Sequence, residues 1–132
     1  MTKQRYSRQI LTVLAIQIAY IGMSVMWNLI GLGLKSIGQQ PLGNSASMTI
    51  VVIMLVLALI IVLSATSARW LYALATGILG LGSLSAIYTA ITGAAELWPS
   101  PFFRVFGASI NVLGLVGFAL ACKLVIFAPK KP

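Results

Sequence analysis

The chain has 132 residues, of which 60% are hydrophobic, and nine Lys and Arg side chains against one carboxylate give it a formal net charge of +8. A mean hydropathy of +1.04 with only 8% charged residues excludes an ordinary soluble domain. With no His and with Glu96 as its single acid, the sequence cannot assemble a Ser/His/Asp triad, a carboxylate dyad or a conventional zinc site. We therefore expect that the chain is not an enzyme and that it binds neither a metal nor a cofactor.

Four apolar segments predict the fold. About 20 apolar residues cross the roughly 30 Å hydrocarbon core of a bilayer as a helix, because in lipid every backbone polar group needs an internal partner. Segments of this kind run over about residues 10–32, 48–65, 70–91 and 102–127. The sequence predicts an all-α integral membrane protein, a single membrane domain over residues 1–132, with four transmembrane helices in an antiparallel bundle.

The first segment, residues 10–32, follows the basic start MTKQRYSR, as the apolar part of a signal peptide would. Its apolar stretch exceeds the roughly 7 to 15 residues typical of such signals, and no small-residue cleavage pattern follows it closely. We expect it to be retained as a membrane anchor. The turn-rich residues 33–47, with several glycines and serines, predict a first external loop.

The second segment, residues 48–65, contains the aliphatic run IVVIMLVLALIIVL and is apolar on every face. Such a surface suits lipid or the apolar face of a partner. The second segment is separated from Arg69 by only three residues, Thr66, Ser67 and Ala68. The second and third helices should therefore form a tight antiparallel hairpin, with Ser67 as the N-cap of the third helix.

The second external connection, residues 92–101, overlaps the most distinctive stretch of the chain, AAELWPSPFFRVF at residues 94–106. Ser100 followed by Pro101 predicts a helix start, with the serine as N-cap and the proline at the first helical position. The aromatic and proline side chains here indicate an interfacial anchor or a contact with another membrane subunit; these candidates are Trp98, Pro99, Phe102 and Phe103. Tyr88 is expected nearby, and Tyr6, Trp70 and Tyr72 at the opposite interface.

The basic residues predict the orientation. Seven fall on the side of the two termini and two on the other side; the seven are Lys3, Arg5, Arg8, Arg69, Lys123, Lys130 and Lys131, and the two are Lys35 and Arg104. By the positive-inside rule both termini are cytoplasmic, in a bacterial inner membrane, or face the matrix in an organelle. The same charges attract anionic lipid headgroups, so the bilayer and not nucleic acid is the expected partner.

Small residues predict how the helices pack, since contacts within lipid rely on close backbone approach. The candidates are Ala73, Gly77 and Gly80 in the third helix, and Gly107, Gly114, Gly117 and Ala121 in the fourth. Three of the fourth-helix positions recur every seven residues and share one face. We expect the third and fourth helices to pack closely with a left-handed crossing.

The two charged candidates each have two interpretations. Glu96 is expected to pair with Arg104 across the external turn; its alternative is a protonatable carboxylate at the mouth of a proton or cation path. Lys123 is expected to reach the headgroups along its own stem, and an anion or lipid-headgroup site is the alternative.

Three amides lie within the apolar segments, at Gln17, Asn28 and Asn111. Amides in such positions most often form hydrogen bonds between helices, although they could also contact a substrate. They leave two function classes open: an accessory or assembly subunit of a larger integral membrane complex, and a homo-oligomeric channel, transporter or holin-like pore. Because these polar positions are few and scattered over the helices, the sequence favours the accessory subunit.

Overall fold

The computed structural model describes residues 3–43 and 45–127, with side chains from Arg8 onward. Over these residues the chain forms four α-helices and no strand: α1 (Lys3–Ser36), α2 (Met48–Ser64), α3 (Arg69–Thr92) and α4 (Pro101–Ala121). A 3-10 turn, η1 (Ala95–Leu97), precedes α4, and a π-helical turn, η2 (Cys122–Ile126), follows it. The all-α prediction is confirmed.

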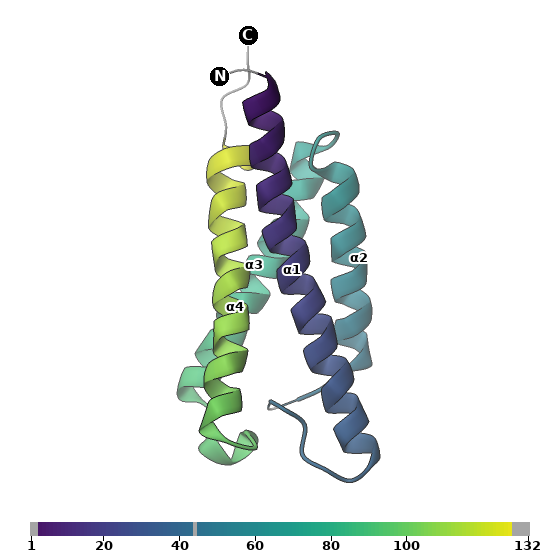
Figure 1. Ribbon diagram of the computed structural model, residues 1–132, viewed down its shortest axis with the longest axis vertical. Helices are drawn as coiled ribbons and strands as arrows, with labels where there is room; N and C mark the ends of the chain where they lie inside the picture. The colour runs from purple at the N-terminus through teal and green to yellow at the C-terminus, as the bar shows by residue number, and fades with distance from the viewer. Residues whose placement is uncertain (1–2, 44, 128–132) are drawn as a thin grey trace.

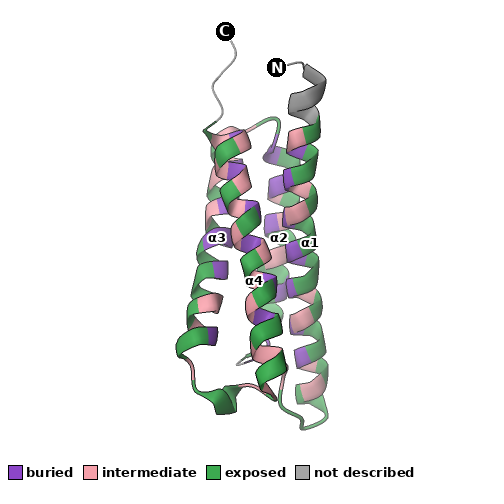
Figure 2. Ribbon diagram, turned by 60° about the vertical axis from the view of Figure 1, so that its left-hand side comes forward, coloured by how far each residue is buried: buried purple, intermediate pink, exposed green. Residues whose placement is uncertain are grey.

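The helices run antiparallel in a bundle, in which α1 and α3 each pack against both α2 and α4 (Figure 1). The start of α1, the α2–α3 connection and η2 lie at one end, which we call the hairpin end. The α1–α2 and α3–α4 connections lie at the other, the loop end. Figure 2 shows that the buried residues face the interior between the helices and that exposed residues cover the outside.

Three of the helical segments are long and apolar enough to cross a membrane, over Arg8–Ser36, Arg69–Thr92 and Pro101–Ile126. The fourth, α2, has 17 residues and spans about 25 Å at 1.5 Å per residue. It is therefore shorter than the roughly 30 Å hydrocarbon core. Its boundaries match the predicted segment to within one residue.

The first helix is longer than predicted, because α1 begins at Lys3 and ends at Ser36. Polar residues flanking an apolar span can continue a helix, and hydropathy does not detect that extension. The end of α1 is set by Gly38, whose φ of +75° is accessible to glycine at little cost. The N–H of Gln39 then donates to the carbonyl of Leu34 at 2.9 Å and closes the last turn.

The predicted caps are correct in position at one helix and wrong at another. Ser100 and Pro101 begin α4 as predicted, but the Ser100 side chain makes no capping hydrogen bond. The N-cap of α3 is Ala68 and not Ser67, whose hydroxyl instead donates to the carbonyl of Leu63 at 2.7 Å. The fourth helix changes from α to π geometry after Ala121, where the expectation was one continuous helix to residue 127.

Glycines of α4 face two other helices. A Cβ added at Gly114 would lie 2.8 Å from the ring of Tyr20 on α1 and would also overlap the Ser83 hydroxyl on α3. A Cβ at Gly117 would lie 3.2 Å from Gln17 of α1. These positions therefore bring α4 against α1 as well as against α3.

The other candidate packing residues differ in their surroundings. A Cβ at Gly80 of α3 would lie 2.8 Å from the Phe118 ring, so α3 and α4 approach closely there, and Ala121 is fully buried. Ala73 is half-buried. Gly77 is not a close-packing position, because a Cβ there would meet no atom within 4 Å. The spacing of small residues correctly predicted the close-packed face of α4. On α3 it predicted close packing at both Gly77 and Gly80, but only Gly80 is close-packed.

Candidate functional site

A buried polar layer crosses the bundle in the half nearer the hairpin end. The Tyr72 hydroxyl donates to Gln17 Oε1 at 2.9 Å, and Gln17 Nε2 donates to the Thr76 hydroxyl at 3.2 Å. Gln17 thus joins α1 to α3, as its amide predicted. The sequence placed Tyr72 at the membrane interface, but its side chain is completely buried, since the Gln17 amide gives its hydroxyl a partner inside the bundle.

The other two amides lie nearer the loop end. Asn111 accepts a hydrogen bond from the buried Tyr20 hydroxyl at 3.1 Å and donates to the carbonyl of Gly107 in its own helix. Asn28 accepts from the backbone N–H of Ser47 at 3.1 Å, and Ser47 is the N-cap of α2. Asn28 therefore fixes the start of α2 relative to α1.

A cavity of about 400 Å³ occupies the half of the bundle nearer the loop end, and all four helices and both loop-end connections line it. Its deep end is formed by Tyr20, Leu57 and Leu79. One turn farther toward the hairpin end, the Gln17 layer and the fully buried Ile61 fill the interior. The cavity therefore does not continue through the bundle.

Two tryptophans lie at the loop end of the cavity. Trp27 and Trp98 both line it, and two glycines leave room for their rings. A Cβ at Gly43 would lie 3.2 Å from each indole, and a Cβ at Gly107 would lie 3.2 Å from Trp27. Within the described part of the chain the buried Nε1 of Trp98 has no hydrogen-bond partner.

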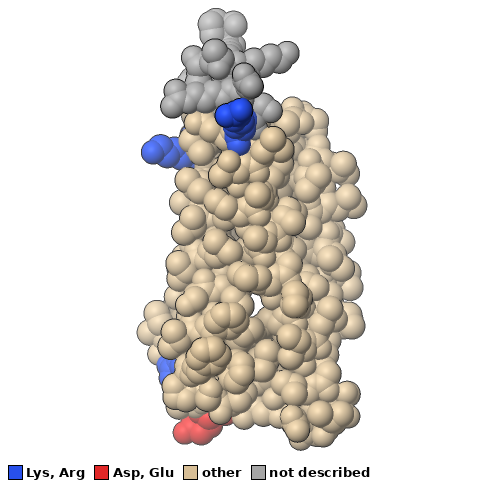
Figure 3. Space-filling model, viewed as in Figure 1, with Lys and Arg blue, Asp and Glu red and all other residues tan. Residues whose placement is uncertain are grey.

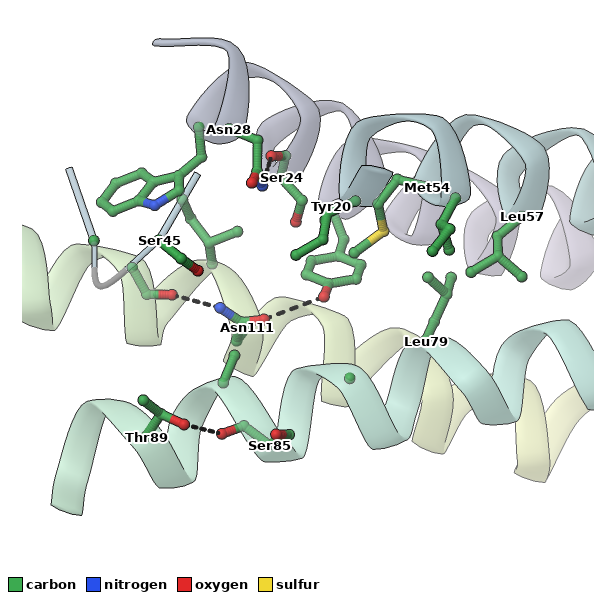
Figure 4. A pocket seen from close by; sticks show the side chains of 18 of the residues that line it. Tyr20, Ser24, Asn28, Ser45, Met54, Leu57, Leu79, Ser85, Thr89 and Asn111 are labelled. Carbon is green, nitrogen blue, oxygen red and sulfur yellow. Dashed lines mark hydrogen bonds between the residues drawn. The ribbon is translucent and has the colours of Figure 1, made fainter. Parts of the chain in front are cut away.

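The polar lining of the cavity is neutral. Figure 4 shows Tyr20, Ser24, Asn28, Ser45, Ser85, Thr89 and Asn111 around the space. Tyr20, Asn28, Asn111 and Thr89 are engaged in the hydrogen bonds drawn or described above, with Thr89 donating to the carbonyl of Ser85. The hydroxyls of Ser24, Ser45 and Ser85 make no hydrogen bond to another described residue, and no charged side chain lines the cavity.

An aromatic cluster at the loop end joins α1 to the first turns of α4, and consists of Trp27, Phe102, Phe103 and Phe106. Phe102 and Phe106 stack with their ring planes 9° apart, and the Trp27 ring lies 5.9 Å from Phe106 and 6.3 Å from Phe103. Phe102 is 67% exposed and Phe106 47%. Of the candidate contact residues, Phe102 and Phe103 belong to this cluster, Pro99 is exposed beside it in the chain, and Trp98 points into the cavity.

The expected ion pair between Glu96 and Arg104 does not form between these two described residues. The Arg104 guanidinium instead donates to three carbonyls at the end of α3, those of Ala90, Ile91 and Gly93. Helix C-termini leave carbonyls without partners, and a nearby cation satisfies them and the helix dipole together. Glu96 is exposed, and its backbone carbonyl accepts from Gln40 Nε2 at 2.8 Å, which ties the two loop-end connections together.

Separate substitutions of Arg104 and Glu96 should distinguish an ion pair between them from the capping of the α3 carbonyls by Arg104. We expect Arg104→Met to destabilise the protein by about 1 to 2 kcal/mol, because up to three carbonyls lose their donor. Glu96→Gln should change the free energy of unfolding by less than about 0.5 kcal/mol. Unfolding in mild detergent with increasing sodium dodecyl sulfate, followed by circular dichroism, measures both. Equal losses in the two variants would indicate an ion pair after all.

Charged side chains lie at the two ends of the molecule, and the band between them on the face shown in Figure 3 is uncharged. Lys123 is exposed within η2, at the hairpin end, where Arg8 and Arg69 also lie. Lys35 and Arg104 lie toward the loop end. The predictions for Lys3, Arg5 and Tyr6 concern side chains that the structure does not describe, and Lys130 and Lys131 lie outside the described residues. In the part of the chain that is described, no group of three or more His, Cys, Asp or Glu could hold a metal ion.

Several residues that shape the site were not candidates from the sequence. Tyr20 and Trp27 lie in the first apolar segment, where hydropathy gives no reason to distinguish them from their neighbours. Ser24, Ser85 and Thr89 are small polar residues that can be satisfied within a helix, so nothing local predicts that they line one cavity.

Comparison of the chain with protein-family models, with curated proteins and with solved structures finds no match.

Proposed function

We propose that this chain is a small, non-catalytic integral membrane protein that acts as an accessory or assembly subunit of a larger membrane protein. Its four helices all span the bilayer, the short α2 with local thinning of the lipid or cover from a partner. Both termini face the cytoplasm or matrix. The support for this orientation is that Arg8, Arg69 and Lys123 share the hairpin end with the start of the chain.

The observation that carries the accessory role is the aromatic cluster. Isolated aromatic rings anchor a protein at the interface, whereas here Phe102, Phe103 and Phe106 are ordered against Trp27 and still leave two large rings exposed. Aromatic side chains held in place cost little entropy on binding and dominate contact energies. An exposed, preorganised group of this kind suits a partner's apolar surface.

The second surface in this proposal is α2. It presents large aliphatic side chains outward along its whole length; those more than half exposed are Met48, Val52, Leu55, Val56, Leu59, Val62 and Leu63. It also exposes no side chain able to line an aqueous path at the middle of the helix. This inventory favours contact with lipid or protein over a pore between identical chains.

Site-specific photocrosslinking tests the proposal in the native membrane. A photoreactive phenylalanine analogue replaces Phe102 in the cluster or Leu59 on α2, and a third variant carries it at Leu11, which is 62% exposed near the hairpin end of α1. We expect positions 102 and 59 to crosslink to the same larger integral membrane protein, and position 11 not to. Adducts between identical chains would support a homo-oligomeric pore instead. Adducts with lipid alone would indicate that the aromatic cluster is only an interfacial anchor.

A further inference from the structure

The cavity at the loop end opens sideways between α2 and α3. These two helices are neighbours at the hairpin end and separate toward the loop end (Figure 1). Several of the residues that line the cavity on this side are exposed, among them Ile53 of α2 and Ile78, Gly82 and Ser85 of α3. If the bundle spans a bilayer, as proposed above, this opening faces the acyl chains and admits molecules from the membrane.

The polar groups inside the cavity converge from three parts of the chain. Ser24 comes from α1 and is buried, whereas Ser45 from the α1–α2 connection and Ser85 from α3 line the cavity where it is exposed; the hydroxyls of all three are uncommitted within the described residues (Figure 4). Uncommitted hydroxyls in apolar surroundings are costly unless a polar molecule meets them. A cavity with this lining therefore favours a ligand that carries a hydrogen-bonding head.

That head must be uncharged. No Lys, Arg, Glu or Asp lines the cavity, and the nearby Arg104 guanidinium is occupied by the carbonyls at the end of α3. A charged group taken out of water without a counterion is strongly disfavoured. Phosphate, carboxylate and ammonium headgroups are excluded on this ground.

The volume limits the ligand further. The volume of about 400 Å³ lies near the lower end of the roughly 300 to 1,000 Å³ that small-molecule sites occupy in proteins. This is enough for a small head and the first part of one chain, and too little for a whole lipid. The rest of the chain can continue past Ile53 and Ile78 into the surrounding apolar phase.

We propose that this cavity binds an uncharged single-chain amphiphile. Its hydroxyl or carbonyl head hydrogen-bonds to Ser24, Ser45 and Ser85, and its chain leaves the bundle between α2 and α3. Trp27 and Trp98 close the cavity over the head at the loop end.

Three photoactivatable probes with the same chain test this proposal on the purified, full-length protein in vesicles of neutral phospholipid. One probe is a long-chain alcohol, the second the corresponding alkyl sulfate, and the third the hydrocarbon without a head. We expect the alcohol to label cavity-lining residues about tenfold more than either other probe, a difference equivalent to about 1.4 kcal/mol. Equal labelling by all three would overturn the proposal, because it would report only exposure to lipid.

Two glycines of α3 provide a matched pair of variants. A Cβ at Gly82 or at Gly77 would meet no atom within 4 Å, so both helix positions can accept a larger side chain. Gly82 lines the cavity and Gly77 does not. We expect Gly82→Leu to lower labelling by the alcohol about tenfold, and Gly77→Leu to leave it unchanged. Equal labelling of the two variants would contradict the assignment of the site.

A smaller change gives a second test if Gly82→Leu does not purify as a folded protein. The double variant Ser24→Ala, Ser85→Ala removes two hydroxyls and adds no volume. It should reduce labelling by the alcohol severalfold and leave labelling by the hydrocarbon unchanged. Unchanged labelling by the alcohol would show that the hydroxyls do not bind the head. Neither outcome depends on a protein partner, so this site can fail while the accessory role stands, or stand while that role fails.

Discussion

Gly114→Leu is expected to destabilise the bundle by about 3 kcal/mol, the largest effect among the substitutions proposed for this protein. Gly114 lies where three helices meet, because its α4 backbone contacts Tyr20 of α1 and Ser83 of α3. The Ser83 hydroxyl can rotate away, but the Tyr20 ring is 2% exposed and hydrogen-bonded to Asn111. A leucine can therefore be accommodated only if α1 and α4 move apart.

The measurement is unfolding in mixed micelles, with the folded fraction followed by circular dichroism as the proportion of sodium dodecyl sulfate rises. Gly22→Leu is the control, since Gly22 is exposed on α1 and a Cβ there would meet no atom within 4 Å. It should shift the free energy of unfolding by less than about 0.5 kcal/mol. Similar midpoints for the two variants would show that α4 does not pack on Tyr20 through Gly114.

Gly114 also shows what sequence spacing can predict. Positions 107, 114 and 121 recur every seven residues, so the sequence identified one close-packing face of α4. Spacing defines a face but does not name the helix opposite; the sequence predicted close packing against α3, and the structure adds a close approach of the same face to α1. The contact with α1 depends on Tyr20, an aromatic residue in the middle of the first apolar segment, where hydropathy does not distinguish it from its neighbours. Only the hydrogen bond to Asn111 explains why its hydroxyl can be buried.

Hydropathy predicted the four helices because it measures the apolar character of a segment, and long apolar segments form helices. It missed the helical continuation of α1 to Lys3 and Ser36, since polar residues extend a helix without signalling it. The charge pattern predicted that Arg104 pairs with Glu96, the nearest opposite charge in the sequence. The carbonyls at the end of α3 are acceptors too, but every residue has a carbonyl, so the sequence does not show which of them lack a partner.

The cavity could not have been predicted from the sequence. It results from the separation of α2 and α3 toward the loop end, a property of helix directions and not of any one residue. Its helical serine and threonine residues were visible in the sequence, yet each could be satisfied by the backbone of its own helix, as the Ser64 and Ser109 hydroxyls are. The Gln17 layer differs, because a buried amide predicts a partner on another helix.

Gln17→Leu is expected to have the second largest effect, a loss of about 2 to 3 kcal/mol in the same unfolding measurement. The substitution removes both hydrogen bonds of the layer and leaves the buried Tyr72 and Thr76 hydroxyls without the amide. The cost comes mainly from these stranded groups, since a leucine fills a similar volume. Thr12→Val is the control, because the Thr12 hydroxyl is exposed and bonds to the carbonyl of Arg8 in its own helix.

A double-mutant cycle separates the hydrogen bond from the packing. Tyr72→Phe removes one stranded hydroxyl, so adding it to Gln17→Leu should cost less than it does in the wild type, with a coupling energy of about 0.6 to 1.7 kcal/mol. Additive losses would instead mean that Gln17 and Tyr72 do not interact in the folded protein. In that case the buried Ile61, and not the hydrogen-bonded layer, would be what ends the cavity toward the hairpin end.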